Sequence, residues 1–187
     1  MRGKYCNFIS MSSTLLHTPP RTIREVFEIL PEGTRCELIN NTLVMSPSPL
    51  DTHQKVLGKI FTKLFSLVEE KKLGELRIAP YDVHFDEKNI FQPDIILIAD
   101  KNTDKIDERG FFGAPDLIIE ILSPSNARFD KEEKKLVYEK FRVKEYFIVE
   151  PYEKLVTGFI LLNNAFALSE TKAGIISSKV FDFTIRF

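Results

Sequence analysis

The spacing of hydrophobic and polar positions changes along the chain and predicts the order of its helices and strands. Residues 22–30 predict a short helix, because a capping box precedes hydrophobic positions three and four residues apart. Residues 35–45 predict a β-hairpin with Asn40-Asn41 in its turn, since asparagine tolerates the positive φ that such turns need. Hydrophobic positions recur at helical spacing through residues 53–68, which predict the longest helix.

The second half of the chain alternates between strand and helix patterns. Residues 76–85 alternate in polarity and predict one half-exposed strand, and residues 128–142 predict a charged helix. Residues 145–149 predict another hydrophobic strand, and residues 154–169 a second hairpin. The tail, residues 175–187, alternates weakly, and we expect it to close the sheet.

Two nearly continuous hydrophobic runs, residues 93–98 and 115–122, predict strands covered on both faces. They carry Asp94 and Glu120, and a carboxylate in such a core costs several kcal/mol to desolvate unless a cation or strong donors meet it. A divalent metal is the partner we favour. The simpler alternative is that both acids cap turns or pair with a neighbouring lysine.

Length indicates a single domain, and the helix and strand patterns together make it α/β. A chain of 187 residues suits a single core, which we place at residues 21–187. Residues 1–20 mix Ser, Thr and Pro, so we expect a flexible N-terminal leader, with Met11 as an alternative start.

Charge and cysteine content narrow the class of protein. A net charge of −1 gives no overall basic bias, so a nucleic-acid contact has to come from a local patch. Two cysteines form no disulfide framework or Cys-based zinc pattern, which fits a cytoplasmic setting. No hydrophobic run is long enough to span a membrane.

The acids at 94 and 120 suit phosphodiester hydrolysis. Mg²⁺ is commonly held by one or two carboxylates, and it offsets charge on a phosphate and orients water. The carbonyl of Ile121, at a strand end, is a candidate third ligand. Lys134 shares a helix face with hydrophobic residues, so we expect it to face inward and stabilise the phosphate.

Two further charged features allow structural explanations. Asp116 competes with Glu120 as the functional acid, but we expect it to pair with Arg109. Residues 128–144 hold seven basic and four acidic residues, and this surplus of +3 would attract a nucleic-acid backbone. An ordinary helix face with pairs such as Asp130 with Lys134 is the commoner origin of such a pattern.

The sequence resembles the Uma2 family, a domain of unknown function in the PD-(D/E)XK nuclease-like superfamily. The resemblance runs from about Thr22 to the C-terminus. It rests on these motifs, in order: residues 32–39 (EGTRCELI), Ser46-Pro47-Ser48-Pro49 followed by His53, Gln92-Pro93-Asp94, residues 113–125 (GAPDLIIEILSPS), Asp130, Lys134, Tyr138, and residues 144–151 (KEYFIVEP).

The resemblance implies a restriction-endonuclease-like core, with a mixed central β-sheet flanked by helices and β-hairpins toward both ends. It implies a divalent-metal site at Asp94 and Glu120, and Glu37 matches a further acidic position that would bind metal or position water. The superfamily's lysine belongs two residues after Glu120, where this chain has Leu122. In this family the lysine has moved to the following helix, which matches Lys134.

Three other residues are candidates for a supporting or substrate-binding role. His53 would donate near the site, although a lone His in a first helical turn is more often solvated. Tyr138 follows Lys134 by one turn, where an aromatic is more often core, and Gln92 precedes Asp94 and would contact a phosphate.

The resulting hypothesis is a DNA endonuclease dependent on Mg²⁺ or Mn²⁺, which by analogy acts as a homodimer. One alternative is a non-catalytic module that binds nucleic acid or protein with the same fold. Another is a metal-dependent enzyme for a small phosphorylated substrate.

Overall fold

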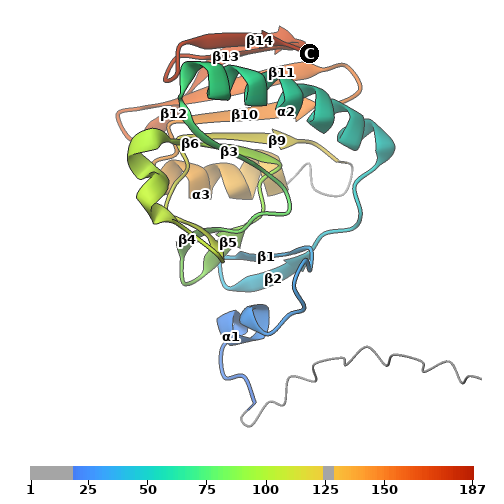
Figure 1. Ribbon diagram of the computed structural model, residues 1–187. Coiled ribbons are helices and arrows are strands. Elements are labelled where there is room, and N and C mark those ends of the chain that lie inside the picture. The colour runs from blue at the N-terminus through green and yellow to red at the C-terminus, as the bar shows by residue number, and fades with distance from the viewer. Residues whose placement is uncertain (1–18, 124–128) are drawn as a thin grey trace, which may run out of the picture.

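A computed structural model of the chain describes residues 19–123 and 129–187. Figure 1 shows its layers, with the C-terminal hairpin and the long helix α2 on one side of a large sheet. Helix α3 lies on the other side, followed by a second sheet and the short helix α1. The bounds of the helices are α1 Ile23–Glu28, α2 Asp51–Lys71 and α3 Lys135–Lys140.

The large sheet is mixed. Its strand order is β12-β11-β10-β9-β6-β3, in which β9 and β10 are parallel and the other pairs antiparallel. The bounds of its strands are β3 Gly74–Ile78, β6 Ile95–Ala99, β9 Leu117–Ile121, β10 Glu145–Glu150, β11 Leu155–Leu162 and β12 Ala165–Ala173.

A second sheet, which the sequence pattern did not predict, has the order β2-β1-β5-β4-β8-β7. The bounds of its strands are β1 Cys36–Ile39, β2 Thr42–Met45, β4 Val83–Asp86, β5 Asn89–Phe91, β7 Ile106–Asp107 and β8 Gly110–Phe112. A 3₁₀ helix, η1 Asp100–Lys105, connects β6 to β7.

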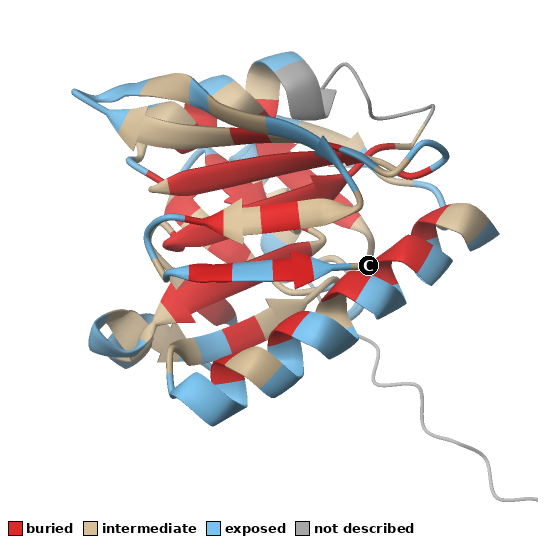
Figure 2. Ribbon diagram, turned by 90° about the horizontal axis from the view of Figure 1, so that it is seen from above, coloured by how far each residue is buried: buried red, intermediate tan, exposed pale blue. Residues whose placement is uncertain are grey.

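Alternation along β6 and β9 divides the molecule into two cores, because successive strand residues face opposite sides of a sheet. Ile95 and Ile119 face α2 and the C-terminal hairpin. Ile96 and Ile118 face α3 and the second sheet. Figure 2 shows these central strands buried and α2 exposing only its outer face.

The predicted fold class is confirmed, and so are several local predictions. The Thr22 side chain accepts a hydrogen bond from the Glu25 backbone N–H at 3.1 Å, which begins α1. Both Asn-Asn turns have positive φ and join antiparallel strands, β1 to β2 and β11 to β12. No helix among the described residues is long and hydrophobic enough to cross a membrane.

Two predictions about elements were wrong. Residues 76–85 form β3 and β4, which belong to different sheets, because the chain leaves the large sheet at Pro80, which has no N–H to donate. The tail forms its own two-stranded sheet, β13 Ile175–Ser178 with β14 Phe183–Arg186, and does not close the large one. The charged helix predicted at residues 128–142 is present over residues 129–140, as a π-helical segment, η2 Phe129–Lys134, followed by α3.

The predicted leader, residues 1–20, lies almost entirely outside the described residues. Only Pro19 and Pro20 belong to the described part, and both are exposed.

Candidate active site

Sheet register brings Asp94 and Glu120 together. In the antiparallel pair of β6 and β9, Ile95 lies opposite Ile119, so continuing the register by one residue places Asp94 opposite Glu120. The Asp94 backbone N–H donates to Glu120 Oε2 at 3.4 Å, which agrees with this placement. Both acids therefore lie at one end of neighbouring strands, on the face covered by α3.

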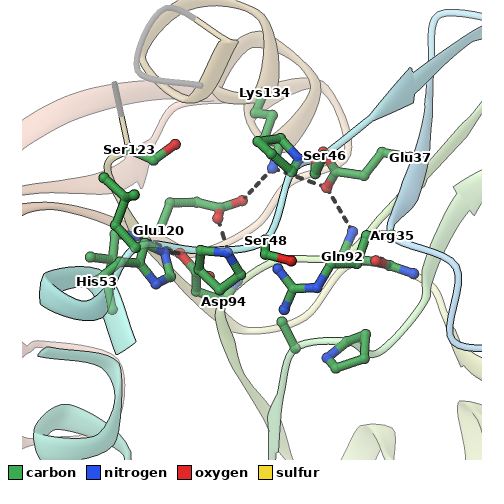
Figure 3. A pocket seen from close by; sticks show the side chains of 16 residues that line it. Arg35, Glu37, Ser46, Ser48, His53, Gln92, Asp94, Glu120, Ser123 and Lys134 are labelled. Carbon is green, nitrogen blue, oxygen red and sulfur yellow. Dashed lines mark hydrogen bonds and ion pairs between the residues drawn. The ribbon is translucent and has the colours of Figure 1, made fainter. Parts of the chain in front are cut away.

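Lys134 links this pair to the second sheet. Its Nζ lies 3.1 Å from Glu120 Oε1 and 3.0 Å from Glu37 Oε1, and all three side chains are at least 94% buried. Figure 3 shows Lys134 between the two acids. A buried charge is stabilised only by well-placed partners, and here one ammonium group serves two carboxylates.

Tyr138 holds the Glu120 side chain through a hydrogen bond from within the core. Its hydroxyl donates to Glu120 Oε1 at 2.7 Å, one helical turn beyond Lys134. Burial, together with the neighbouring Glu120 carboxylate, raises the pKa of Tyr138 well above its ordinary value, so the phenol keeps its proton and remains a donor. Glu120 Oε1 therefore accepts from two groups.

Asp94 is held through only one of its oxygens. Asp94 Oδ2 accepts the Ile121 backbone N–H at 2.7 Å and lies 3.1 Å from His53 Nε2. Because a carboxylate only accepts, His53 Nε2 is the donor in this contact. Asp94 Oδ1 makes no hydrogen bond to a described residue and remains available to a ligand.

These side chains line one pocket of about 310 Å³, drawn in Figure 3. Its lining includes seven of the predicted site residues: Glu37, His53, Gln92, Asp94, Glu120, Ile121 and Lys134. Tyr138, the eighth, is fully buried and reaches the site through Glu120. The structure thus brings every predicted site residue to one place.

Gln92 lines the pocket, and its hydrogen bonds also brace the fold around it. Its backbone N–H donates to Glu37 Oε1 at 2.7 Å, and its side chain donates to Asp82 Oδ1 at 2.9 Å and to the Thr34 carbonyl at 3.3 Å. Gln92 therefore fixes Glu37 and spans from β1 to the start of β4, in addition to lining the pocket.

Sequence reasoning missed Arg35, Ser46 and Ser48, which line the same pocket. Arg35 directly precedes β1 and is two residues before Glu37, so strand alternation puts both side chains on one side. This period-2 relation was readable in the sequence, whereas the position of the serine loop depends on how β2 is joined to α2.

The predicted pairing of Asp116 with Arg109 was wrong. Asp116 forms an ion pair with Lys144 and accepts from the Ala99 N–H at 2.8 Å and from Asn102 at 3.0 Å. Burial alone would raise the pKa of Asp116, but the hydrogen bonds from these three residues outweigh it, so the pKa lies below its ordinary value. Arg109 lies in the turn between β7 and β8, beside Asp107.

At least three of the seven basic residues in 128–144 have partners within the fold. Lys134 is buried between acids, Lys144 pairs with Asp116, and Lys135 lies 3.9 Å from the centre of the Phe159 ring. The side chain of Asp130, which the sequence suggested as a partner for Lys134, lies outside the described residues.

The carboxylates of Asp94 and Glu120 suit a hard cation that takes only a few of its ligands from the protein. Among the described residues there is no group of three or more His, Cys, Asp or Glu side chains arranged to hold a metal ion. Mg²⁺ does not require one, since it commonly keeps several waters and is bound through one or two carboxylates. The pair of Asp94 and Glu120, with a free Asp94 oxygen, is a set of this kind.

A solved structure shares the fold of this chain. The crystal structure of "a putative nuclease belonging to DUF820" from Anabaena variabilis ATCC 29413 matches with a TM-score of 0.71 and 19% identity. The match covers 87% of this chain and 92% of that one. At this identity the likeness shows the fold alone, which is the restriction-endonuclease-like class.

The chain belongs to the Uma2 family, whose sequence profile matches residues 24–186 and is described as "Putative restriction endonuclease". Family membership supports a nuclease-like function. No match is found among the curated proteins.

Proposed function

We propose that this protein is a DNA endonuclease that depends on Mg²⁺ or Mn²⁺. One observation carries the proposal: Asp94 and Glu120 lie on adjacent strands of one pocket, with the buried Lys134 at hydrogen-bonding distance from Glu120. Paired carboxylates with a nearby amine are suited to hydrolysing a phosphodiester.

In this proposal Asp94 Oδ1, Glu120 and the Ile121 carbonyl hold the metal. When bound, the ion offsets negative charge on the phosphate and makes a water more nucleophilic at neutral pH. The Ile121 N–H and His53 orient Asp94, and Tyr138 orients Glu120, so that both carboxylates are positioned before a substrate arrives.

Lys134 and Glu37 complete the arrangement. Lys134 stabilises charge on the phosphate, because its ammonium group faces the pocket and keeps a fixed position between two acids. Glu37 holds Lys134 through Oε1 and supports the attacking water. Water is the nucleophile, and no covalent intermediate forms.

A plasmid-cleavage assay with Mg²⁺ or Mn²⁺ tests the proposal, with Asp94→Ala as the inactive variant. We expect the wild type to nick or linearise DNA and Asp94→Ala to lose at least 100-fold in rate, the order of loss for electrostatic machinery of this kind. Asp104→Ala, which removes an exposed acid from η1, is the matched control and should cleave like the wild type. Equal rates for wild type and Asp94→Ala, across salt and metal concentrations, would defeat the proposal.

Two rival functions predict different results in the same experiments. A non-catalytic module would bind DNA or a protein without cleaving and without binding divalent metal in calorimetry. An enzyme for a small phosphorylated substrate would bind metal but leave plasmid intact. The proposed homodimer and cytoplasmic location are expectations, and sedimentation analysis tests the first of them.

A further inference from the structure

We propose that Arg35, Ser46 and Ser48 form a second phosphate subsite in the pocket, for a backbone phosphate of the nucleic acid next to the one that is cut. This inference rests on the proposed nuclease function and adds a binding site to it. Figure 3 shows the Arg35 side chain extending into the pocket that also contains the acids.

The Arg35 guanidinium is a cation without a partner in the described part of the chain. It makes no hydrogen bond or ion pair with any described residue, although Glu37, Asp94 and Glu120 line the same pocket. Lys134, the other cation there, is buried between two of these acids. A half-buried arginine with five unused donors is therefore available to a ligand that accepts hydrogen bonds.

Charge indicates that this ligand is an anion. The pocket lining holds three carboxylates and two cations, a formal balance of −1 with His53 neutral, and Lys134 already pairs with Glu37 and Glu120. A phosphate entering the pocket meets repulsion from Asp94 and Glu120 and attraction from Arg35. A divalent ion at the acids would change the formal balance to +1. The ion and Arg35 would then both attract a phosphate.

Two serine hydroxyls add neutral donors to the same pocket. Ser46 and Ser48 lie in the segment from β2 to α2, two residues apart, and neither hydroxyl bonds to a described residue. The alternating Pro47 and Pro49 restrict the backbone of this segment and remove its competing N–H donors. The serines are therefore held in place while their hydroxyls remain free.

Phosphate is the anion that this set of donors suits best. Guanidinium presents two parallel N–H groups that match two phosphate oxygens, and hydroxyls donate to the remaining ones. A polynucleotide presents successive phosphates along each strand, so a strand with one phosphate at Asp94 and Glu120 brings a neighbouring phosphate into the same pocket. A free phosphate monoester has the same chemistry but only one such group.

Fluorescence anisotropy with a labelled DNA duplex, in Ca²⁺ to suppress cleavage, tests the subsite. We expect Arg35→Ala to weaken binding at least tenfold and to lower the slope of log affinity against log salt by about 1, because one phosphate contact is lost. Arg35→Lys should recover part of the affinity, and Ser48→Ala should weaken binding by a few-fold.

Arg186→Ala is the matched control, since Arg186 is an exposed arginine on β14, outside the pocket. It removes the same charge and should leave both affinity and salt slope unchanged. Metal binding and melting temperature of Arg35→Ala should match the wild type, which would separate loss of the subsite from loss of the fold or of the metal site.

The outcomes distinguish this inference from the proposed function. If the wild type cleaves DNA and Arg35→Ala binds it as tightly as the wild type at every salt concentration, the subsite is wrong. If no cleavage occurs but Arg35→Ala still loses affinity selectively, the subsite is supported and the nuclease proposal fails. If a mononucleotide displaces the duplex at equal concentration, the assignment to a polynucleotide is overturned.

Discussion

Two aspartates precede neighbouring strands of the large sheet, yet their surroundings differ. Asp116, before β9, accepts from an ammonium, an amide and a backbone N–H, so both of its oxygens are engaged within the fold. Asp94, before β6, is held through Oδ2 alone. One residue type is thus structural in one place and a candidate ligand in the other, according to how many of its lone pairs the protein uses.

The lowered pKa of Asp116 predicts a pH-dependent contribution to stability. Its contribution is present above the ordinary Asp value of 3.8 and is lost as pH falls through the lower folded-state pKa, because the unfolded chain then takes up the proton first. We expect Asp116→Asn to lower the free energy of unfolding by about 1–3 kcal/mol near pH 7.

Urea denaturation of wild type and Asp116→Asn from pH 7 to pH 2 checks this. The difference between the two proteins should shrink once pH falls below about 4. A difference that stayed constant over the whole range would show that the Asp116 charge contributes nothing.

At the scale of the elements, the strand that follows Asp94 is held in place by its neighbour β3. β3 pairs with β6 along its full length, from Gly74 opposite Ala99 to Ile78 opposite Ile95, and so supports the strand that follows Asp94. Gly74 has φ +134°, and a Cβ there would lie 2.0 Å from the Ile98 carbonyl oxygen. This close approach of backbone to backbone is available only to glycine.

Gly74→Ala should therefore destabilise the protein, by roughly 1–3 kcal/mol for the backbone strain alone. Gly58→Ala is the control, because Gly58 lies within α2 and a Cβ there meets nothing within 4 Å. Removing a helical glycine should be neutral or stabilise by about 0.5–1 kcal/mol. Thermal denaturation compares the two, and equal melting temperatures would contradict the role given to Gly74.

At the scale of the whole molecule, the pocket is lined by residues from the large sheet, the second sheet, α2 and the junction of η2 and α3. Asp94 and Glu120 come from the large sheet, Glu37 from the second sheet, Lys134 from the junction of η2 and α3, and His53 from α2. Neither sheet alone contains the site. Ligand binding is therefore expected to stabilise the packing of these layers against one another.

Asp94→Asn tests whether the acids exist to hold a cation. Without metal, the variant should melt at the same or a higher temperature than the wild type, because neutralising one of two facing carboxylates relieves repulsion while the amide oxygen can still accept from Ile121. With Mn²⁺ at 100 times its dissociation constant, the wild type should gain about 2.7 kcal/mol and the variant much less.

Differential scanning calorimetry with and without Mn²⁺ measures both effects. Stabilisation of wild type and Asp94→Asn by equal amounts would place the metal elsewhere. A variant that is less stable without metal would make Asp94 a structural residue.

Local signals in the sequence were sufficient for much of the fold. The capping box at Thr22, the Asn-Asn turns and the two hydrophobic runs each act over a few residues, so the elements they predict are confirmed. Strand and helix patterns indicated Asp94, Glu120, Ile121 and Lys134, and the family resemblance added Glu37. The structure gathers all eight predicted site residues around one pocket. Their chemical roles stay predictions.

Other features depended on contacts between distant residues, which local periodicity does not encode. Pro80 divides one alternating run between two sheets, and the tail pairs with itself. Asp116 meets Lys144 rather than Arg109, because the β9–β10 pairing, not sequence distance, sets its neighbours.

The sequence by itself determined which residue types occupy buried strands and where turns occur, since desolvation and backbone preference act on each residue and its close neighbours. Only the tertiary structure decided that Lys134 lies between Glu37 and Glu120 and that Arg35 has no acidic partner among the described residues. The physical reason is that a charge interacts over a few ångströms in space, and chain folding sets those distances.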